Sequence, residues 1–464
     1  MQANAVSVVS RRRTRAALCG KMVLVAAPGL EQPRSGPPQG GALRRPRRLS
    51  VSELRKAVWC LICAELILQQ SVIKCIIRGM IKISDNIFNV GVNDHKIKFF
   101  EGQYPVPFGM AYNSYVILDE KIAVADTVDR NFGYEWLENL EKVLKDRQPD
   151  YLIVHHMEPD HSANIAEFLN KYSSAKVVLS AVAVNILKAY FGDAFNARLQ
   201  TVKEGDCLEL GLHTLRFIGA PMVHWPEVLM SYETSEKVLF SADGFGSFGA
   251  NDVDTEEYWD DEARRYYYGI VGKFGTQVLN VLKKAAALEI KTICSLHGPV
   301  LTGDLSHHLE EYTKWASYES ENDGVFIPFT SVYGHTEEAV NLLAEKLRAS
   351  GKDVKTMNLA ENDLSYALDA AFLYKNVVFA TTTYNTGIYP FMNDLITRLV
   401  EHGFCKTNVA FIENGSWAPS AARIMKEKLS ECKELNFIEP VVTVKGALNT
   451  ASKEALNSLS EKLK

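Results

Sequence analysis

Residues Tyr151–Ser162 read YLIVHHMEPDHS and place an apolar run directly before a dense group of polar side chains. Tyr151–Val154 has the length and composition of a short buried strand, and Pro159 prevents that strand from continuing. The potential metal ligands that follow are His156, Glu158, Asp160 and His161. Imidazole and carboxylate without thiol form a ligand set suited to iron, manganese or zinc. Because a strand end on a rigid scaffold can aim several side chains at one point, we expect a loop here that binds metal.

Three later segments repeat this arrangement of a short apolar strand followed by a potential ligand. The strands and their ligands are Leu215–Ile218 with His224, Val238–Phe240 with Asp243, and Thr292–Leu296 with His297. Each ligand taken alone has a simpler explanation, such as a core histidine or a turn aspartate, so the prediction rests on the joint pattern. Seven groups exceed the ligands of one zinc ion and suit two metals that share a bridging carboxylate.

The other histidines do not enter this prediction. His155 is expected to point to the opposite face of its strand from His156, where it would at most support the ligands. The histidines assigned to turns or to exposed helical positions are His95, His213, His307, His308 and His402.

Composition is that of a globular protein, with 47% hydrophobic and 23% charged residues. The 464 residues suffice for two or three domains. Residues 1–50 hold ten Lys and Arg against one acid, whereas residues 80–464 hold 37 basic and 53 acidic side chains. An acidic body argues against a nucleic-acid-binding protein.

Residues 1–79 are not expected to belong to the fold. Their Arg-rich, acid-poor composition is typical of a transit peptide. The apolar run Val58–Leu68, interrupted by Glu65, is too short to span a bilayer, so no stable membrane association is expected. We favour a third interpretation, in which the true start is Met80 and residues 1–79 come from an over-extended gene model.

The body of the chain contains four widely spaced cysteines. Such spacing is unlike a disulfide framework, and it predicts reduced, mostly buried thiols in a cytoplasmic protein. These residues are Cys207, Cys294, Cys405 and Cys432.

Residues 80–322 predict two sheets with outer helices. The first strands, expected to form an antiparallel sheet, are Ile87–Val92, Ile97–Phe100, Ser114–Leu118 and Ile122–Ala125. Apolar periodicity predicts helices at Tyr134–Lys145, Asn164–Asn170, Ala183–Phe191 and His307–Glu321.

Residues 323–464 change to strands that alternate with helices, a pattern typical of a five-stranded parallel α/β fold. The predicted strands are Val325–Phe329, Val354–Met357, Val377–Ala380, Val409–Ile412 and Val441–Val444. Ligands bind beyond the carboxyl ends of such strands. The loop Ser331–Thr336, which opens a helix, supplies hydroxyls and free amides for an anion. The loops Thr381–Pro390 and Glu413–Ser420 offer further donors, and a flat ring would fit between Tyr384 and Trp417.

The ligand pattern HxExDH, followed by HWP, SADGF and HGP, resembles the metallo-β-lactamase-like domain of flavodiiron proteins. Hydrolytic members of that superfamily carry HxHxDH, and the carboxylate of Glu158 in place of histidine favours iron. The resemblance implies that one iron is bound by His156, Glu158 and His224. It implies that the other is bound by Asp160, His161 and His297, with Asp243 as the bridge.

The C-terminal region resembles flavodoxin, whose phosphate-binding motif is T-x-T-G-x-T. Ser331 and Tyr333 depart from threonine at two positions of that motif. The resemblance implies FMN as the cofactor. The implied FMN-binding residues are Ser331, Val332, Tyr333, Gly334, His335, Thr336, Thr383, Tyr384, Asn385, Thr386, Gly387, Asn414, Gly415, Ser416 and Trp417.

Together these resemblances imply a flavodiiron oxidoreductase of the two-domain type. An αββα metallo-β-lactamase-like sandwich at 80–322 would hold two irons per chain, and a flavodoxin-like domain at 323–464 would hold FMN. The implied reactions are reduction of dioxygen to water, of nitric oxide to nitrous oxide, or both. No C-terminal CxxC pair marks a fused rubredoxin, so electrons are expected from a separate rubredoxin or similar carrier with an NAD(P)H reductase.

The resemblance also implies an assembly, and two alternative functions remain. A head-to-tail homodimer, or a dimer of such dimers, would place each flavin against the irons of its partner. The principal alternative is a metal-dependent hydrolase similar to glyoxalase II with a regulatory flavodoxin domain. A further alternative is a flavin electron carrier with a metal-free sandwich.

Overall fold

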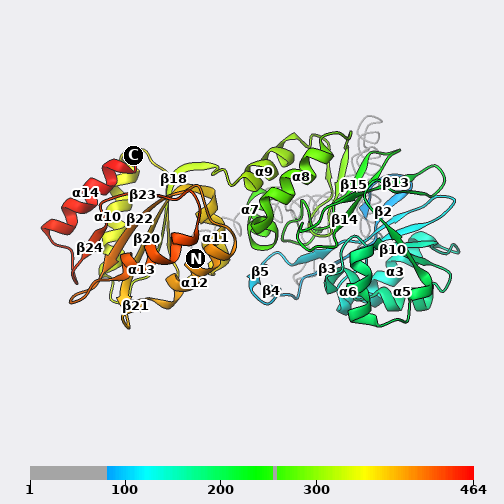
Figure 1. Ribbon diagram of the computed structural model, residues 1–464, viewed down its shortest axis with the longest axis horizontal. Coiled ribbons are helices and arrows are strands. Elements are labelled where there is room, and N and C mark those ends of the chain that lie inside the picture. The colour runs from blue at the N-terminus through cyan, green and yellow to red at the C-terminus, as the bar shows by residue number, and fades with distance from the viewer. Residues whose placement is uncertain (1–80, 254–258) are drawn as a thin grey trace, which may run out of the picture. The chain divides into compact units, whose positions relative to one another are not determined.

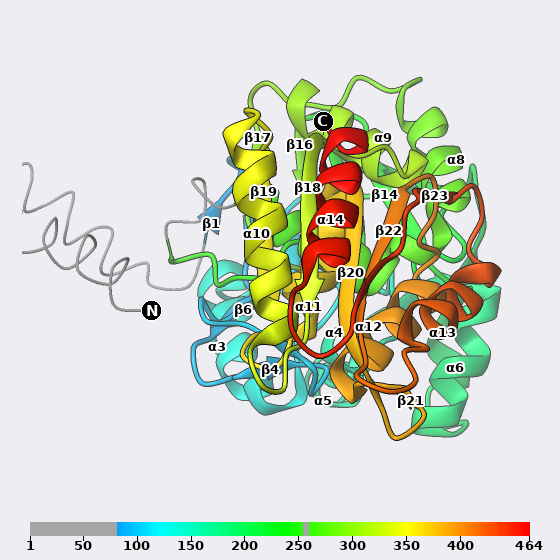
Figure 2. The ribbon, with the colours of Figure 1, turned by 90° about the vertical axis from the view of Figure 1, so that its left-hand side faces the viewer.

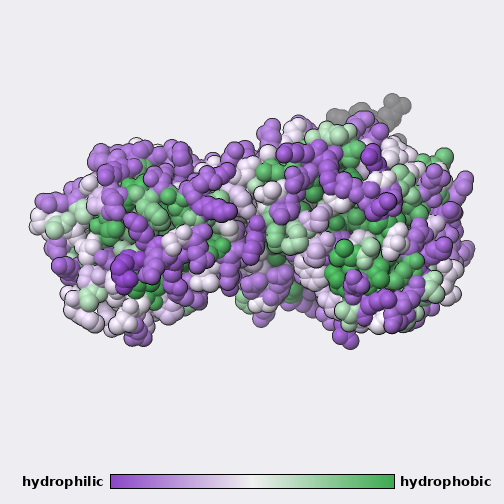
Figure 3. Space-filling model, viewed as in Figure 1, coloured by the Kyte–Doolittle hydropathy of each residue, from purple (hydrophilic) through white to green (hydrophobic). Residues whose placement is uncertain are grey.

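The computed structural model describes residues 81–253 and 259–464, which fall within one compact unit, Lys74–Lys464. The predictions for the leader, including the start at Met80, lie outside the described residues. Within the described ranges, no helix is both long and apolar enough to cross a membrane. On the face drawn in Figure 3, polar residues are interspersed with apolar ones, as is ordinary for a protein surface.

The first large sheet in the described residues has seven strands and is mixed (Figure 1). Its order is β1 (Ile81–Lys82), β2 (Ile87–Asn89), β7 (Tyr115–Ile117), β8 (Ala123–Ala125), β9 (Tyr151–Ile153), β10 (Lys176–Ser180) and β11 (Leu199–Val202). Within this sheet, β1, β2, β7 and β8 pair antiparallel, as predicted, and β8, β9, β10 and β11 pair parallel. The predicted strand Ile97–Phe100 is wrong as a member of this sheet, because β4 (Phe99–Phe100) pairs with β5 (Tyr104–Pro105) in a separate hairpin.

The second sheet has six strands in the described residues. Its order is β12 (Cys207–Glu209), β13 (Thr214–Gly219), β14 (Leu229–Glu233), β15 (Val238–Phe240), β16 (Thr292–Cys294) and β17 (Leu301–Thr302). Alternate residues of facing strands fill the space between the sheets. Tyr115 and Ile117 of β7 pack with Phe217 and Phe240 there, whereas Val116 faces the outer helices. The predicted two-layered sandwich is confirmed.

Helices cover the outer faces of the sandwich (Figure 1). They are α3 (Gly133–Leu144), α4 (Pro159–Ser162), α5 (Ile165–Lys171), α6 (Ala181–Phe191), α7 (Trp259–Tyr266), α8 (Gly275–Ala285) and α9 (Ser306–Ser317). Short turns of helix lie at η1 (Arg130–Phe132), η2 (Asn196–Arg198), η4 (Tyr267–Val271) and η5 (Gly272–Phe274). The sequence patterns predicted α3, α5, α6 and α9 within a few residues, but not α7 and α8. Strands β3 (Val92–Asp94) and β6 (Met110–Tyr112) pair beside the first sheet.

The third sheet confirms the predicted parallel α/β pattern. Its order is β19 (Val354–Asn358), β18 (Asn322–Phe329), β20 (Tyr374–Tyr384), β22 (Asn408–Asn414), then β23 (Asn436–Phe437) and β24 (Val442–Val444), which both pair with β22. The fifth strand position is therefore occupied by two short segments. The hairpin strand β21 (Gly387–Ile388) extends from β20.

Helices lie on both faces of the third sheet because its strands are buried on both sides. Helices α10 (His335–Ala349) and α14 (Thr450–Lys462) lie side by side on one face (Figure 2). The other face packs against α11 (Leu364–Leu373), α12 (Pro390–Glu401) and α13 (Ala421–Lys428), with η6 (Leu429–Glu431) after α13. Along β20, Val378 and Ala380 pack in the core beneath α10 and α14, and Val377 and Phe379 pack in the core beneath α11, α12 and α13. The predicted domain boundary at 322/323 stays a proposal.

The four cysteines of the described residues are free thiols. Cys294 is buried, Cys405 and Cys432 are partly buried, and Cys207 is exposed. The prediction that they are mostly buried is therefore wrong, because three of them lie at strand ends or in connections near the surface.

Candidate metal centre and ligand pocket

The seven predicted ligands converge from four separated segments. His156 and Glu158 follow β9, His224 follows β13, Asp243 follows β15 and His297 follows β16. Asp160 and His161 lie on the short helix α4, so the prediction of a loop is wrong for these two residues. Pro159 occupies the first turn of that helix, where its missing N–H costs nothing.

The ligand atoms form two groups, each with all atoms within 4.8 Å of one another. The first group consists of His156, Glu158, His224 and Asp243, and the second of Asp160, His161 and His297. Asp243 faces both groups. Its Oδ2 lies 3.0 Å from His224 Nε2, and its Oδ1 lies 3.4 Å from His161 Nε2. One carboxylate with an oxygen toward each group has the geometry of a bridging ligand.

The outer nitrogens of two histidines are held by hydrogen bonds. His156 Nδ1 lies 2.8 Å from Glu227 Oε1, and His297 Nδ1 lies 2.8 Å from the carbonyl oxygen of Ala111. Since both partners are acceptors, each Nδ1 carries a proton, and Nε2 is the nitrogen that faces the centre. His156 Nε2 lies 3.1 Å from Glu158 Oε2, a position that a proton or a metal ion between the two atoms stabilises.

The acids of the centre are the second sign that it fits cations. Both carboxylate oxygens of Asp160 and Oδ1 of Asp243 are buried without a hydrogen-bond partner. Taking these two carboxylates out of water costs several kcal/mol each unless opposite charge compensates them. Two divalent metal ions would supply that charge, and the mixture of imidazole and carboxylate suits iron.

The acids and imidazoles also stabilise each other's charged forms. Burial lowers the pKa of His224, but hydrogen bonds to Asp243 and Glu158 outweigh it and raise the pKa to about 9. Burial raises the pKa of Glu158, but His156 and His224 outweigh it and lower the pKa to about 2. Because metals bind deprotonated imidazole, metal ions and protons compete for this centre.

Aromatic rings form the wall of the centre. The rings of Phe100, Tyr112 and Tyr266 lie 5.2, 5.7 and 5.5 Å from the His297 ring, centroid to centroid. The Trp225 ring meets His156 edge-on at 5.1 Å. Such a wall excludes water from one side, which strengthens electrostatic interactions inside. Glu158, His224 and Asp160 keep partial exposure of 10 to 19% of their side chains and mark the open side.

Two of the remaining histidines are buried. His155 points away from the ligands, as predicted, and its nitrogens contact Asp126 Oδ2 at 2.5 Å and Ser231 Oγ at 2.7 Å. His213 lies in a turn, as predicted, and it is buried between Asp119 and Glu236. The turn packs against Asp119, an acidic residue of a distant segment.

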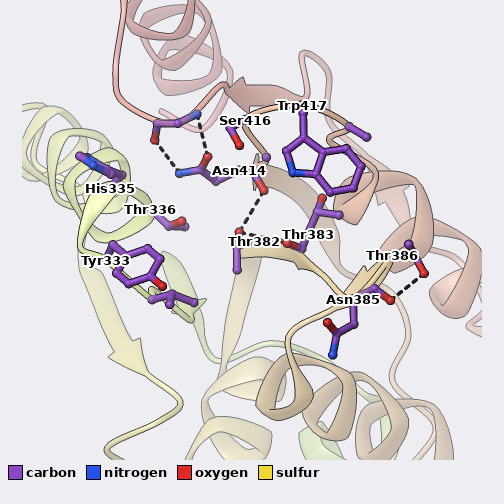
Figure 4. Close-up of a pocket in the computed structure, with 14 residues that line it drawn as sticks. Tyr333, His335, Thr336, Thr382, Thr383, Asn385, Thr386, Asn414, Ser416 and Trp417 are labelled. Carbon is purple, nitrogen blue, oxygen red and sulfur yellow. Dashed lines mark hydrogen bonds between the residues drawn. The ribbon is translucent and has the colours of Figure 1, made fainter.

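A pocket lies at the carboxyl ends of the third sheet. Its lining residues are Val332, Tyr333, His335, Thr336, Thr382, Thr383, Asn385, Thr386, Asn414, Gly415, Ser416, Trp417, Ala418 and Gly446. Figure 4 shows Tyr333 and Thr336 on one side of the pocket and Trp417 on another. Gly334, with a φ of +86°, caps α10 and turns the chain into the helix. Gly334 provides no side-chain cap, and a helix N-terminus of this kind favours a bound anion such as a phosphate.

Eleven of the predicted cofactor residues line this pocket, and four do not. The four are Ser331, Gly334, Tyr384 and Gly387. Tyr384, expected to flank a flat ring, packs edge-on against Tyr389 at 5.2 Å. Two further lining residues, Thr382 and Ala418, lie within the two predicted loops but are not among the implied FMN-binding residues. Gly446 lies outside every predicted loop, and because it follows the fifth strand, a search of every strand end would have found it.

Glu227, whose carboxylate contacts His156, is not among the predicted site residues. It stands directly after HWP and before the apolar residues of β14, and an isolated acid at such a position is the only local signal.

Comparisons with known proteins agree with this architecture. The family model described as ODP family beta lactamase matches residues 110–298. The chain is 32% identical over 375 residues to "Nitric oxide reductase" of Moorella thermoacetica, which spans 78% of this chain and 93% of that relative. The solved rubredoxin oxygen:oxidoreductase of the anaerobe Desulfovibrio gigas has a TM-score of 0.78 at 25% identity, over 83% of this chain and 97% of that one. The flavodiiron protein of Giardia intestinalis shares the fold, with a TM-score of 0.73 at 24% identity over 83% and 96% of the two chains.

Proposed function

Because this chain belongs to the flavodiiron protein family, we propose that it reduces dioxygen to water, nitric oxide to nitrous oxide, or both. FMN would occupy the pocket at the carboxyl ends of the third sheet, and two irons would occupy the seven-residue centre. Electrons would come from a separate rubredoxin or similar carrier served by an NAD(P)H reductase. The observation that carries the proposal is the orientation of Asp243, whose two oxygens face two different ligand groups.

When bound, FMN and a pair of irons supply electron transfer in single steps and the reduction of a diatomic gas. The chain positions the reaction. Asp243 would set the separation of the two metals, and Glu158 would add negative charge to the first group. The rings of Phe100 and Tyr266 would keep water from the His297 side. The open side, where Glu158 and His224 are partly exposed, would admit the gas.

The FMN site follows from the lining of the pocket. The start of α10 would hold the phosphate, because its N-cap residue Gly334 provides no side-chain cap and Thr336 lies in the first turn. Tyr333 and Trp417, which are 88% and 85% exposed, stand on two different loops and would pack on the flat ring. We assign Tyr333 this role in place of Tyr384.

The assembly and location complete the proposal. A head-to-tail dimer, alone or paired into a tetramer, would bring each FMN to the irons of the partner chain. The free thiols of the described residues are consistent with the cytoplasm, where disulfides are rare.

The test is anaerobic purification of the full chain, followed by iron, zinc and FMN counts and by parallel rates of oxygen and nitric oxide consumption. Two irons and one FMN per chain, with consumption of either gas, are the expected result. Zinc with thioester hydrolysis would instead favour the hydrolase similar to glyoxalase II. FMN without metal would identify an electron carrier and contradict the proposal.

A further inference from the structure

Glu227 is a buried carboxylate that reaches one metal ligand from the opposite side of the centre. Its side chain is fully buried, and Oε1 accepts the Nδ1–H of His156 at 2.8 Å. The same oxygen accepts the backbone N–H of Met157 at 2.9 Å. The two hydrogen bonds that this oxygen accepts therefore fix both the ring of His156 and the chain segment that carries it.

The backbone of Glu227 is itself held in place. Ser180 Oγ, at the end of β10, donates a hydrogen bond of 2.9 Å to the Glu227 carbonyl oxygen. Glu227 immediately precedes the apolar start of β14, whose Leu229 pairs with Gly219 of β13. The acid thus lies in a turn anchored beside the second sheet, whereas His156 lies on the connection that it orders.

The second ligand group has no equivalent of this acid. His297 donates its outer N–H to the neutral carbonyl oxygen of Ala111. His161 Nδ1 is buried without a hydrogen-bond partner. The two groups therefore differ in how firmly, and with what charge, their imidazoles are held.

We propose that Glu227 is a positioning residue that makes the group containing His156 the tighter of the two metal positions, so that the metals bind in a fixed order. This inference rests on the proposed two-metal centre. A carboxylate on the outer nitrogen of a ligating histidine fixes its tautomer and ring orientation and makes Nε2 a stronger donor. A carbonyl oxygen in the same position also fixes the tautomer of the histidine, but it makes Nε2 a weaker donor than a carboxylate does. A histidine whose outer nitrogen has no partner gains neither effect.

The test is a titration of the full-length apoprotein with Co²⁺, a probe whose visible absorption reports ligand geometry. The apoprotein is made by chelation, and an anaerobic Fe²⁺ titration repeats the measurement. The wild-type protein is expected to bind two ions in two resolved steps. In Glu227→Gln, which keeps an acceptor oxygen but removes the charge, the first step is expected to weaken about tenfold. In Glu227→Ala it weakens up to about 100-fold, and the absorption of the first bound ion changes. The second step keeps its wild-type affinity in both variants.

Glu233→Gln is the matched control. Glu233 is also fully buried, at the end of the same strand β14, but it accepts the backbone N–H groups of Ser235 and Glu236 and contacts no histidine. Its variant reports the general cost of neutralising a buried acid in this sheet, and both binding steps should stay as in the wild type.

The outcomes separate the inference from the proposed function. A wild-type protein that binds neither Co²⁺ nor Fe²⁺ would refute the two-metal centre itself. Two wild-type steps that remain unchanged in both Glu227 variants would refute the inference alone. Equal weakening of both steps, or the same change in Glu233→Gln, would show a merely structural role and would also overturn it.

Discussion

Asp243→Asn is the substitution that tests the centre most directly, because Asp243 is the residue that the two ligand groups share. Oδ2 lies 3.0 Å from His224 Nε2, and Oδ1 lies 3.4 Å from His161 Nε2. An asparagine offers one carbonyl oxygen and one NH₂ group, and the NH₂ cannot bind a metal. Whichever way the amide turns, one group receives an N–H in place of a ligand oxygen. At least one metal should therefore be lost.

The remaining metal should bind more weakly, because the variant also removes a negative charge. Two unit charges 4 Å apart interact by about 4 kcal/mol at an effective dielectric constant of about 20. That free energy corresponds to about a thousandfold in a binding constant. The variant should contain at most one iron per chain after anaerobic purification, and it should consume neither gas at a measurable rate. Its FMN content should be unchanged, because the pocket lies in the third sheet.

Asp206→Asn is the control for this substitution. Asp206 caps a surface turn of the same sandwich by accepting the Lys203 backbone N–H at 3.0 Å, a bond that asparagine also makes. The control should keep two irons and full activity. If Asp243→Asn also retained two irons with wild-type affinity, Asp243 would not be a shared ligand and the argument for two adjoining metals would fail.

Three further predictions concern the pocket and the buried charges. Trp417→Ala should raise the dissociation constant of FMN about tenfold in a fluorescence titration, without lowering apoprotein stability, because the ring is 85% exposed. Arg264→Leu should cost about 3–5 kcal/mol in urea unfolding, because it leaves buried Asp369 without its 2.8 Å partner. Burial lowers the pKa of His213, but Glu236 and Asp119 outweigh it and raise the pKa. Its stabilisation is therefore full below pH 6.5 and is lost as pH rises through the folded value, so wild type should lose its advantage over His213→Gln as the pH rises above 6.5.

Each of these three predictions can be contradicted by a specific result. Unchanged FMN affinity in Trp417→Ala would place the flat ring elsewhere. The double variant Arg264→Leu/Asp369→Leu should recover most of the lost stability, and a failure to recover would show that packing, not the unpaired charge, causes the loss. An equal pH dependence of wild type and His213→Gln would show that the buried histidine does not titrate with folding.

The strands and many of the helices of this protein were predictable because they depend on the short-range periodicity of apolar residues. Val238–Phe240 is predicted and observed as a strand with the same limits, since three apolar β-forming residues stand between polar turns. The alternation of strands and helices after residue 322 likewise predicted the third sheet. The candidate ligands could be predicted for the same reason, because each follows a strand that the pattern identifies. Helices α7 and α8 escaped notice, since buried Arg264 and Arg265 of α7 read as surface residues until their acidic partners are known.

What the sequence by itself determined was which residue types stand at the ends of strands, and hence the chemistry available to a centre. Only the tertiary structure decided how those residues are grouped, with Asp243 between two sets of ligands and His161 on a helix. It alone revealed Glu227, which contacts a histidine 71 positions away. The physical reason is that backbone conformation depends on neighbours in the chain, whereas the burial and pairing of a charge depend on which distant segments pack against it.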